Sequence, residues 1–467
     1  MDALLSRFRE QLGDRYILTS AEDTAPFFTD WRGRYTGLAL CVVLPGSVDE
    51  VSWLVKTCAA AGVPIVPQGG NTGLCGGATP VHGEVVICLR RLARIRSCDP
   101  ANNSMVVEAG CTLASVQSAA EAVDRFFPLS LASEGSATIG GNLSTNAGGV
   151  QVLRYGNARD LTLGLEVVLP DGRIWNGLRA LRKDNTGYDL KHLFIGAEGT
   201  LGIITAATLK MFPCPPSIAT AWISIAKPDD AVNLLSALRG RAADDVSAFE
   251  IIDRASLNLV LKHIPASRDP IEQESPWQVL IELSGGRSDL SELLECSLEQ
   301  AMTEGWVTDA VIARSEGQAR AFWGLRENIS EAQRREGVSI KHDISVPVSR
   351  IPEFIERANH ELGAEFENLR VVCFGHIGDG NLHFNVSKPD AMPQHAFIDQ
   401  TPLVNRVVHD IVADLGGSIS AEHGVGQLKR EEILRYKSEI EMSLMRAIKQ
   451  ALDPQGLMNP GKVLASD

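Results

Sequence analysis

Short apolar runs punctuated by glycine alternate with stretches of helical periodicity in the first half of the chain. Runs rich in β-branched residues predict strands at 39–44, 65–67, 85–89, 105–108, 165–169 and 203–211. Between the first two, apolar residues recur from Val51 to Cys58 at i, i+3, i+4 and i+7, which is typical of an amphipathic helix over 51–61. The sequence pattern over residues 36–212 therefore predicts a domain that mixes helices and strands.

The second half has a different texture. Three prolines within 213–216 interrupt regular structure and mark a boundary. Beyond them, predicted strands at 220–226 and 278–284 alternate with predicted helices at 229–239 and 290–304. This order favours a second, antiparallel sheet covered by helices, ending near residue 415. The chain closes with a motif loop from 420, a helix over 438–452 and a turn at 458–462, and it opens with a short helix over 3–12.

Composition narrows the class of protein. At 467 residues, 44% hydrophobic and 22% charged, the chain is long enough for two to four packed domains. A net charge of -14 disfavours binding to nucleic acids or anionic membranes. The nine cysteines form no CxxC pair, no apolar run approaches 18 residues, and the N-terminus lacks the features of a signal peptide. We therefore expect a cytoplasmic protein with free thiols and no transmembrane segment.

The densest local signal is the loop 67–77, directly after the predicted strand at 65–67. Five glycines in nine residues let the backbone approach a ligand closely, and successive free N–H groups suit a pyrophosphate. The alternative is a tight loop in solvent. Two commoner nucleotide motifs are excluded. No GxGxxG is present, and the GxxxxGK match at 456–462 is followed by Val463 and only four more residues, too few for a P-loop helix.

Two further glycine loops follow, at 133–142 with 146–149 and at 196–204. Together with 67–77 they resemble, in order and spacing, the FAD-binding domain of the vanillyl-alcohol oxidase and p-cresol methylhydroxylase superfamily. The resemblance implies FAD, and the lack of histidine in the first loop implies that the FAD is noncovalent. The implied cofactor residues are Pro67, Gln68, Gly69, Gly70, Asn71, Thr72, Gly73, Gly76, Gly77, Ser133, Gly135, Thr138, Gly140, Gly141, Asn142, Asn146, Gly148, Glu198, Gly199, Gly202, Ile203 and Asn459.

A second signal lies in two apolar runs that flank Asp379 and Gly380, a dipeptide favoured in two-residue hairpin turns. With that turn, partner residues sum to 759, so His376 faces His383 across the strands, close enough for one metal ion. Glu422, in the glycine-containing loop 420–426, offers a third ligand. Two histidines and one carboxylate leave open positions on the ion, as at a catalytic metal site. The plainer alternative is that these histidines are ordinary core or surface residues.

Both signals together resemble the FAD-dependent D-2-hydroxyacid dehydrogenases, above all the D-2-hydroxyglutarate branch, over residues 30–464. The resemblance implies that His376, His383 and Glu422 bind zinc and that His423 is the catalytic base. Iron or manganese would also suit such ligands. It further implies substrate contacts from Arg326, Ser330, Lys341, Asn385 and His423, with serine where the relatives carry threonine. Arg326 and Ser330 are expected four residues apart on one helix, although Arg326 could instead pair with Glu327 or Glu331.

The sequence thus predicts an α+β protein with four parts. These are an N-terminal segment 1–35 packed on the FAD domain, a two-part FAD-binding domain at 36–212, a substrate domain on an antiparallel sheet at 213–415, and a segment 416–467 that returns to the FAD domain. The predicted activity is metal-assisted oxidation of a D-2-hydroxy acid, with hydride passing to flavin N5 and a proton to His423.

Several alternatives stay open at this point. They are a D-lactate dehydrogenase of the same family, a flavin-dependent alkyl-glycerone-phosphate synthase, and a flavoprotein without catalysis. No Fe–S cluster motif or nicotinamide fingerprint is present, so the electron acceptor cannot be read from the sequence. The resemblance to the family implies an external acceptor, such as an electron-transfer flavoprotein or a quinone. The sequence leaves open whether the protein is a monomer or a homodimer.

Overall fold

The structure, a computed structural model, describes residues 2–366 and 368–465. The chain divides into two compact units. The first comprises Met1–Gly148, Gly156–Cys214 and Glu422–Asp467, and the second comprises Gly149–Tyr155 and Pro215–Ala421. The stretch 149–155, which lies inside the predicted FAD domain, is thus part of the second unit. Compact units need not coincide with domains, so the predicted domain limits stay a prediction.

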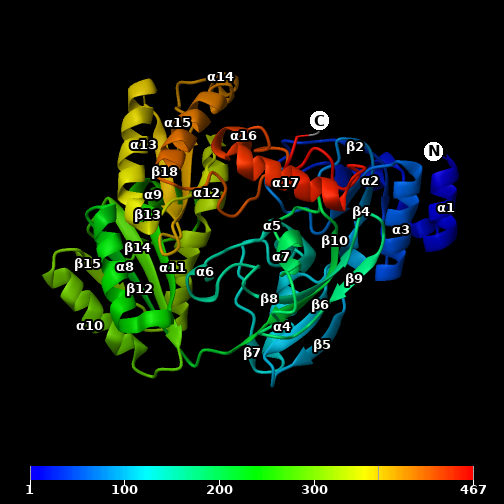
Figure 1. Ribbon diagram of the computed structural model, residues 1–467. Coiled ribbons are helices and arrows are strands. Elements are labelled where there is room, and N and C mark those ends of the chain that lie inside the picture. The colour runs from blue at the N-terminus through cyan, green and yellow to red at the C-terminus, as the bar shows by residue number, and fades with distance from the viewer. Residues whose placement is uncertain (1, 367, 466–467) are drawn as a thin grey trace. The chain divides into compact units, whose positions relative to one another are not determined.

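The first unit contains a small, mostly parallel sheet with strand order β1-β2-β4-β3. Its strands are β1 (Ile17–Leu18), β2 (Leu38–Val43), β4 (His82–Cys88) and β3 (Ile65–Gln68). Helix α3 (Val48–Ala61) begins where the Ser47 hydroxyl accepts the Glu50 N–H and ends at Gly62 in the left-handed conformation, φ 63°. Helix α1 (Asp2–Leu12) packs on α3, with the Phe8 and Trp53 ring centroids 6.0 Å apart (Figure 1).

An antiparallel five-stranded sheet, in the order β5-β6-β10-β8-β9, forms the other half of this unit. Its strands are β5 (Ile95–Asp99), β6 (Ser104–Glu108), β10 (Ile203–Lys210), β8 (Thr162–Val168) and β9 (Ile174–Gly177). A two-stranded ribbon pairs β11 (Phe212–Pro213) with β7 (Arg125–Phe126). The helices of this unit's first two segments, besides α1 and α3, are α2 (Ala21–Phe28), α4 (Leu113–Glu121), α5 (Ile139–Thr145) and α7 (Lys191–Phe194). Two sheets in one unit match the expected two-part architecture.

From Glu422 onward the C-terminal segment is part of the first unit, in line with the fold prediction, while residues 416–421 belong to the second unit. The segment contains α16 (Ile433–Tyr436) and α17 (Glu439–Leu452), and α17 begins with a capping box between Ser438 and Glu441. Past α17 the chain runs beside β3. The Ile65 N–H donates to the Leu457 carbonyl at 2.8 Å, and the Asn459 N–H donates to the Ile65 carbonyl at 2.7 Å.

The second unit is built on an eight-stranded antiparallel sheet in the order β15-β12-β14-β13-β18-β19-β16, with β17 also pairing β19. The strands are β12 (Ser217–Ile225), β13 (Val246–Asp253), β14 (Trp277–Gly285), β15 (Asp309–Ile312), β16 (Ser339–Ile340), β17 (Asp343–Ser345), β18 (Arg370–Gly375) and β19 (Asn381–Ser387). The antiparallel sheet confirms the predicted fold class.

Helices cover both faces of this sheet (Figure 1). Helices α9 (Arg254–His263), α11 (Glu316–Glu327) and α12 (Ile329–Glu336) share one apolar core with Trp222, Leu280 and Phe374 of the sheet. On the other face α8 (Pro228–Ala242) and α10 (Leu290–Thr303) pack on β12 and β14, and α13 (Ile351–Glu365) packs on α8. The unit's remaining helices are α6 (Val152–Tyr155), which packs on β13, α14 (Gln394–Asp399) and α15 (Thr401–Asp414).

The predicted hairpin is present, but its register is wrong by two residues. Partner numbers in β18 and β19 sum to 757, so His383 faces Phe374 instead of His376. His376 lies in a longer turn, in which its carbonyl accepts the Asp379 N–H at 3.1 Å and Asp379 Oδ1 accepts the Asn381 N–H at 3.0 Å. A slip of two residues preserves the side of the sheet, so His376 and His383 still lie close, with ring centroids 6.0 Å apart.

The prediction that one helix carries both Arg326 and Ser330 is also wrong. The helix is divided at Asn328, where α11 ends and α12 begins. The Asn328 side chain donates to the Gly324 carbonyl at 2.7 Å, which satisfies a carbonyl at the end of α11. Arg326 is buried, whereas Ser330 is exposed.

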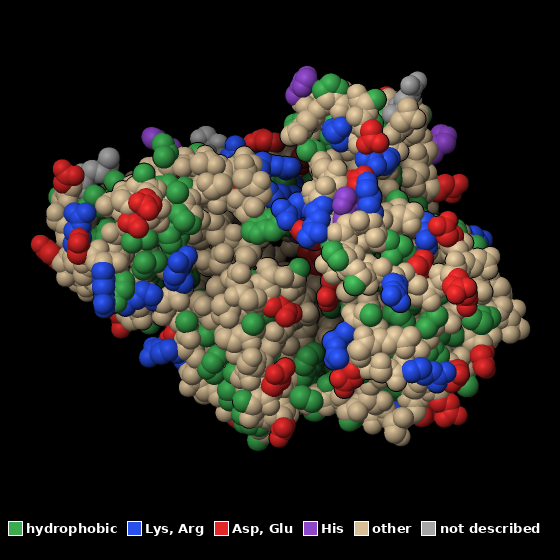
Figure 2. All heavy atoms as spheres, turned by 180° about the vertical axis from the view of Figure 1, so that it is seen from behind, with side chains coloured by type: hydrophobic (Ala, Val, Ile, Leu, Met, Phe, Trp, Pro, Cys, Tyr) green, Lys and Arg blue, Asp and Glu red, His purple; other side chains and the backbone are tan. Residues whose placement is uncertain are grey.

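The surface carries acidic, basic and hydrophobic side chains (Figure 2). On the face that Figure 2 presents, acidic and hydrophobic side chains are scattered, and several basic side chains gather near the centre of the view. Among the described residues, no helix has the length and apolarity needed to cross a bilayer.

Candidate active site

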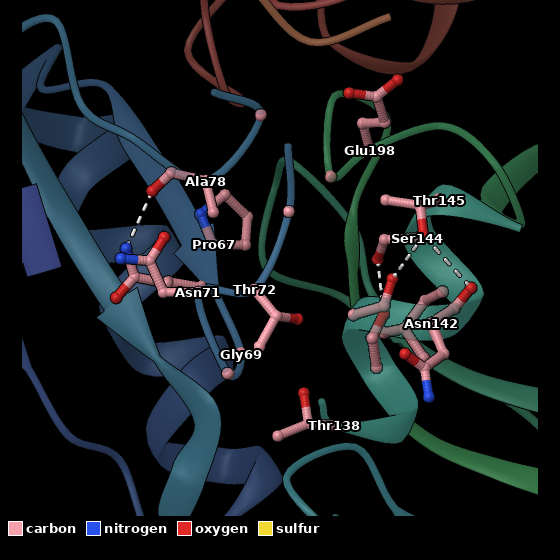
Figure 3. A pocket seen from close by; sticks show the side chains of 18 of the residues that line it. Pro67, Gly69, Asn71, Thr72, Ala78, Thr138, Asn142, Ser144, Thr145 and Glu198 are labelled. Carbon is pink, nitrogen blue, oxygen red and sulfur yellow. Dashed lines mark hydrogen bonds between the residues drawn. The ribbon is translucent and has the colours of Figure 1, made fainter. Parts of the chain in front are cut away.

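The first unit contains a cavity of ≈ 900 Å³, open solvent at its mouth included, at the place where the glycine loops meet. Figure 3 shows residues of the first loop, among them Gly69 and Thr72, on one side and residues of α5, among them Asn142 and Ser144, on the other. Predicted cofactor residues that line the cavity are Pro67, Gln68, Gly69, Gly70, Asn71, Thr72, Gly73, Gly77, Thr138, Gly140, Gly141, Asn142, Glu198, Gly199, Gly202 and Ile203. Three separate loops thus share one cavity.

The first loop offers backbone donors to an anion. Within the described chain, the N–H groups of residues 69–73 have no hydrogen-bond acceptor. The loop also requires glycine, because a Cβ on Gly70 would lie 2.0 Å from the Ser136 carbonyl oxygen, and one on Gly69 would lie 2.2 Å from Thr138 Oγ1. A row of unpaired donors on a closely packed loop suits a pyrophosphate.

Some polar side chains in the cavity have no hydrogen-bond partner among the described protein atoms. Thr138 Oγ1 and Asn142 Nδ2 are buried and unpaired, and both residues line the cavity (Figure 3). Buried polar atoms are seldom left unpaired in a native protein. A large ligand with several hydrogen-bonding groups, such as FAD, therefore fits these residues.

Some predicted cofactor residues do not line the cavity. Gly76, Ser133, Gly135, Asn146, Gly148 and Asn459 are not among its lining residues. Asn459 donates to the carbonyls of Gly77 and Glu198, at 2.9 and 2.7 Å, and so ties two of the loops together. Sequence reasoning missed other lining residues, including Cys75, Ser144 and Thr145, because their side chains carry no motif.

His423 also lines this cavity. Its loop is fixed by Glu198, whose two carboxylate oxygens accept the N–H groups of Val425 and Gly426 at 2.7 and 2.8 Å. Burial raises the pKa of the Glu198 carboxyl, while these two N–H groups and the nearby Lys429 and Lys462 act to lower it. In Figure 3 the carboxylate points away from Thr138 and Asn142. Glu198 therefore lines the cavity and also holds the His423 loop through its carboxylate.

The second unit holds the histidine pair. His383 lies on β19 opposite Asp343 of β17, and His376 lies in the turn beyond β18. His376 Nδ1 is 2.6 Å from Glu250 Oε1, a bond that fixes the ring and directs Nε2 away from Glu250. Neither Glu250 nor Asp343 was predicted, because an isolated acidic residue inside an apolar strand carries no sequence signal.

Arg326 is bound to the same glutamate. Its Nε donates to Glu250 Oε2 at 2.7 Å, and its guanidinium carbon lies 4.8 Å from the centroid of the Phe374 ring. Arg326 thus pairs with neither Glu327 nor Glu331. Burial tends to raise the pKa of Glu250, but the electrostatic interactions and hydrogen bonds with His376 and Arg326 outweigh burial and hold this pKa at about 2.

The remaining predicted substrate and metal residues differ in their exposure and in their backbone or side-chain bonds. Ser330 is exposed on α12, and Lys341 is half-buried between β16 and β17. The amide of Asn385 is bound at both ends, by the His342 N–H at 3.2 Å and by Gln333 Oε1 at 3.0 Å. Glu422 directly follows Ala421, and the backbone N–H of Ala421 donates to the Asp343 carbonyl at 3.3 Å. The roles of these residues stay predictions.

Comparison with known families identifies both halves of the chain. Residues 39–177 match the family described as "FAD binding domain", and residues 214–463 match "FAD linked oxidases, C-terminal domain". Among solved structures, p-cresol methylhydroxylase with substrate bound is similar with a TM-score of 0.76 and 18% identity, covering 100% of this chain and 98% of that one. An alkyldihydroxyacetonephosphate synthase also has a TM-score of 0.76, with 18% identity and coverage of 98% and 86%. At these identities the likeness shows the fold.

Three curated relatives are much closer in sequence. The protein named "D-2-hydroxyglutarate dehydrogenase, mitochondrial" of Arabidopsis thaliana is 39% identical over 98% of this chain and 81% of its own length. Those named D-2-hydroxyglutarate dehydrogenase of Xanthomonas citri pv. viticola and Stutzerimonas stutzeri are 39% and 36% identical, over 96% and 99% of this chain and 94% and 99% of theirs. The chain therefore belongs to the family of FAD-linked oxidases that includes the D-2-hydroxyglutarate dehydrogenases, and it is an FAD-dependent dehydrogenase.

Proposed function

We propose that the protein oxidises D-2-hydroxyglutarate, or a closely similar D-2-hydroxy dicarboxylate, to the 2-oxo acid. The observation that carries this proposal is the position of His423, which lines the same cavity as the three FAD loops. A titratable imidazole in the cofactor cavity supplies a base at the place where a substrate hydroxyl must lose its proton. The names of the curated relatives support the choice of substrate.

When bound, FAD supplies the acceptor for the hydride from C2 of the substrate. His423 takes the hydroxyl proton, which requires that its imidazole be neutral before reaction. Glu198 fixes the loop after His423 through the N–H groups of Val425 and Gly426, and so limits the positions that the imidazole can occupy. The first loop binds the pyrophosphate of FAD through N–H groups of residues 69–73, without a covalent link.

His376, His383 and Glu422 are proposed to hold a divalent metal, most simply zinc, because imidazole and carboxylate are the ligands that such ions prefer. The Glu250 bond at His376 Nδ1 supports this role, since a metal-binding histidine commonly donates its other N–H to a carboxylate. The metal would supply Lewis-acid stabilisation of the substrate alkoxide. Asp343, which pairs with His383 between β17 and β19, places a further carboxylate-bearing residue beside this histidine.

Arg326 and Lys341 are proposed to bind the substrate carboxylates, with Ser330 and Asn385 completing the pocket. Glu250 engages only Nε of Arg326, so the two terminal guanidinium nitrogens remain to form a fork around a carboxylate. Two cations in a protein of charge -14 favour a dianionic substrate over lactate. Each such charge-assisted hydrogen bond contributes about 1.5–3 kcal/mol.

Electrons are proposed to leave the reduced enzyme for an external acceptor, an electron-transfer flavoprotein or a quinone. A cytoplasmic location is proposed as well. It is supported by the nine cysteines, all of which are free thiols, as in a reducing compartment.

A substrate panel with a dye acceptor tests the activity. The enzyme should reduce the dye fastest with D-2-hydroxyglutarate as substrate. A chelator should abolish turnover, and added zinc should restore it. Flavin that stays oxidised with every 2-hydroxy acid under anaerobic conditions would contradict the proposal. Turnover that is insensitive to chelation would contradict the metal assignment alone.

Lys341→Ala tests the choice of a dicarboxylate. We expect kcat/KM for D-2-hydroxyglutarate to fall by 10-fold or more and that for D-lactate to change by less than 3-fold, because lactate has no distal carboxylate. Lys183→Ala, at an exposed lysine of the first unit, is the control and should change neither value. An equal loss for both substrates would refute the distal-carboxylate role and favour a lactate dehydrogenase.

A further inference from the structure

Glu250 is a buried acidic residue to which neither the motifs nor the comparisons assign a role. It lies in the middle of β13, between Phe249 and Ile251, and its exposed fraction is 0%. An ionised carboxylate costs several kcal/mol to bury unless it is paired and hydrogen-bonded. Its presence inside a central strand therefore requires compensation from its surroundings.

Compensation comes from two different functional groups, one on each oxygen. Oε1 binds His376 Nδ1 at 2.6 Å, and Oε2 binds Arg326 Nε at 2.7 Å. The sheet places them there. Ile252 pairs with Phe374 between β13 and β18, so two residues further along this register Glu250 lies opposite His376. Arg326 approaches from α11 on the same face, which also carries Trp222 and Phe374.

The same residues are connected by a second path. The Arg326 guanidinium lies over the Phe374 ring, the Phe374 and His383 ring centroids are 4.9 Å apart, and those of His383 and His376 are 6.0 Å apart. Glu250, His376, His383, Phe374 and Arg326 thus form a closed ring of contacts within the second unit. A change of position at Arg326 must be accommodated at His376, because both are bound to one carboxylate.

A purely structural ion pair would need Arg326 alone. The additional bond to His376 Nδ1 has a specific chemical effect. It makes Nδ1 the protonated nitrogen of the neutral imidazole and leaves the lone pair on Nε2 for a metal. The bond to Arg326 Nε similarly leaves the two terminal nitrogens in one fixed plane, stacked on Phe374.

We propose that Glu250 is a positioning residue that orients a metal-binding histidine and a carboxylate-binding arginine together, and so couples metal affinity to substrate affinity. This inference rests on the proposed function, since it takes His376 as a metal ligand and Arg326 as a substrate contact. Glu250 itself touches neither metal nor substrate. Metal binding tightens the hold on the substrate carboxylate, and substrate tightens the hold on the metal, by the same factor.

Glu250→Gln tests the proposal on the full-length enzyme loaded with FAD. The amide retains the shape but cannot accept from both partners with a full charge. We expect the zinc dissociation constant, measured by competition with a chromogenic chelator, to rise 10- to 100-fold. The KM for D-2-hydroxyglutarate should rise by at least 10-fold, the FAD content should stay unchanged, and kcat at saturating zinc and substrate should fall less than KM rises.

Glu282→Gln is the matched control. Glu282 lies on the adjacent strand β14, and its carboxylate accepts from Trp323 Nε1 at 2.8 Å and from the Ser247 hydroxyl at 3.0 Å. It contacts neither histidine nor Arg326, so its amide variant should keep the wild-type zinc affinity and KM. A loss of zinc affinity that is as large in this variant would show that any buried charge in the sheet has the effect, and would overturn the proposal.

The two possible failures give different results. A wild-type enzyme that binds no metal, or whose flavin is not reduced by 2-hydroxy acids, overturns the proposed function. A wild-type enzyme that binds zinc while Glu250→Gln binds it equally well overturns the role of Glu250 alone. If Glu250→Gln does not fold, Glu250→Asp decides, because it keeps the charge but is too short to reach both partners. Unchanged zinc affinity and KM in that variant would likewise overturn the role.

Discussion

Some side chains near the cofactor cavity hold a loop in place through hydrogen bonds. Glu198 is an example. Its sequence context implied cofactor binding, but its carboxylate accepts two successive N–H groups of the loop after His423. A Cβ on Gly424 would lie 2.6 Å from Glu198 Oε1, so that loop and the carboxylate fit closely.

For Glu198→Gln we therefore expect a catalytic defect with retained FAD. The amide nitrogen cannot accept a hydrogen bond, so one N–H loses its partner, which costs about 1.5–3 kcal/mol, or roughly 10- to 100-fold in kcat if the cost falls on the placement of His423. Steady-state kinetics and the flavin absorbance of the purified variant check this. Glu84→Gln, at a buried glutamate that accepts the Val81 N–H instead, should keep wild-type kcat. Loss of FAD from the Glu198 variant would point to cofactor binding after all.

Lys462 provides a prediction for pH. Burial lowers its pKa from 10.5 to about 8, although the charges of Glu84 and Glu198 oppose this shift. Between pH 8 and pH 10.5 the unfolded chain keeps this proton and the folded protein has lost it, so stability rises with pH across this window. The cost below pH 8 is about 3 kcal/mol. As pH rises from 7.5 to 9.5, the unfolding free energy of the wild type should rise relative to that of Lys462→Met, because methionine has no proton to lose. Urea denaturation measures both values. A constant difference would contradict the lowered pKa.

At the scale of elements, the turn between β18 and β19 determines where His376 points. The Asp-Gly pair predicted a two-residue turn, but the strands separate earlier, and the segment 376–380 forms the turn. Gly380 has φ 93° and packs so closely that a Cβ would lie 2.3 Å from the Val346 carbonyl oxygen. This contact with the segment between β17 and α13 stabilises the longer turn, and local sequence does not encode it.

Gly380→Ala should therefore destabilise the protein by about 1–3 kcal/mol in urea unfolding, because the residue must leave a left-handed conformation or push away a backbone oxygen. It should also weaken zinc binding, since the turn carries His376. Gly363→Ala is the control. Among the described residues, and apart from its chain neighbours and the backbone of α13 itself, no heavy atom lies within 4 Å of its Cβ position. Alanine there should therefore be neutral or stabilise by up to about 1 kcal/mol. Equal stability of the two variants would show that the turn tolerates a side chain.

At the scale of the whole molecule, the chain passes repeatedly between its two compact units, and every residue that lines the cofactor cavity belongs to the first. Adding FAD to the apoprotein should therefore stabilise that unit, by about 2.7 kcal/mol at 100 times the dissociation constant. Hydrogen exchange should slow most at the unpaired N–H groups of residues 69–73. Protection concentrated within 215–421 instead would place the cofactor elsewhere.

The sequence by itself determined the glycine loops, the order of the main strands and helices, and the residue types at the proposed site. Each depends on local chemistry. Glycine is needed where backbones approach closely, apolar periodicity marks an element, and histidines and carboxylates are the groups that bind metals. The fold class and the family followed from these features and are confirmed.

Only the tertiary structure decided the register of the hairpin, the break at Asn328 and the pairing of Glu250 with His376 and Arg326. Each of these depends on contacts between residues far apart in the chain. Glu250 and His376 are 126 positions apart, and nothing near either residue indicates the other. Strand pairing and packing bring them together, because a buried carboxylate is stable only where the fold supplies its partners.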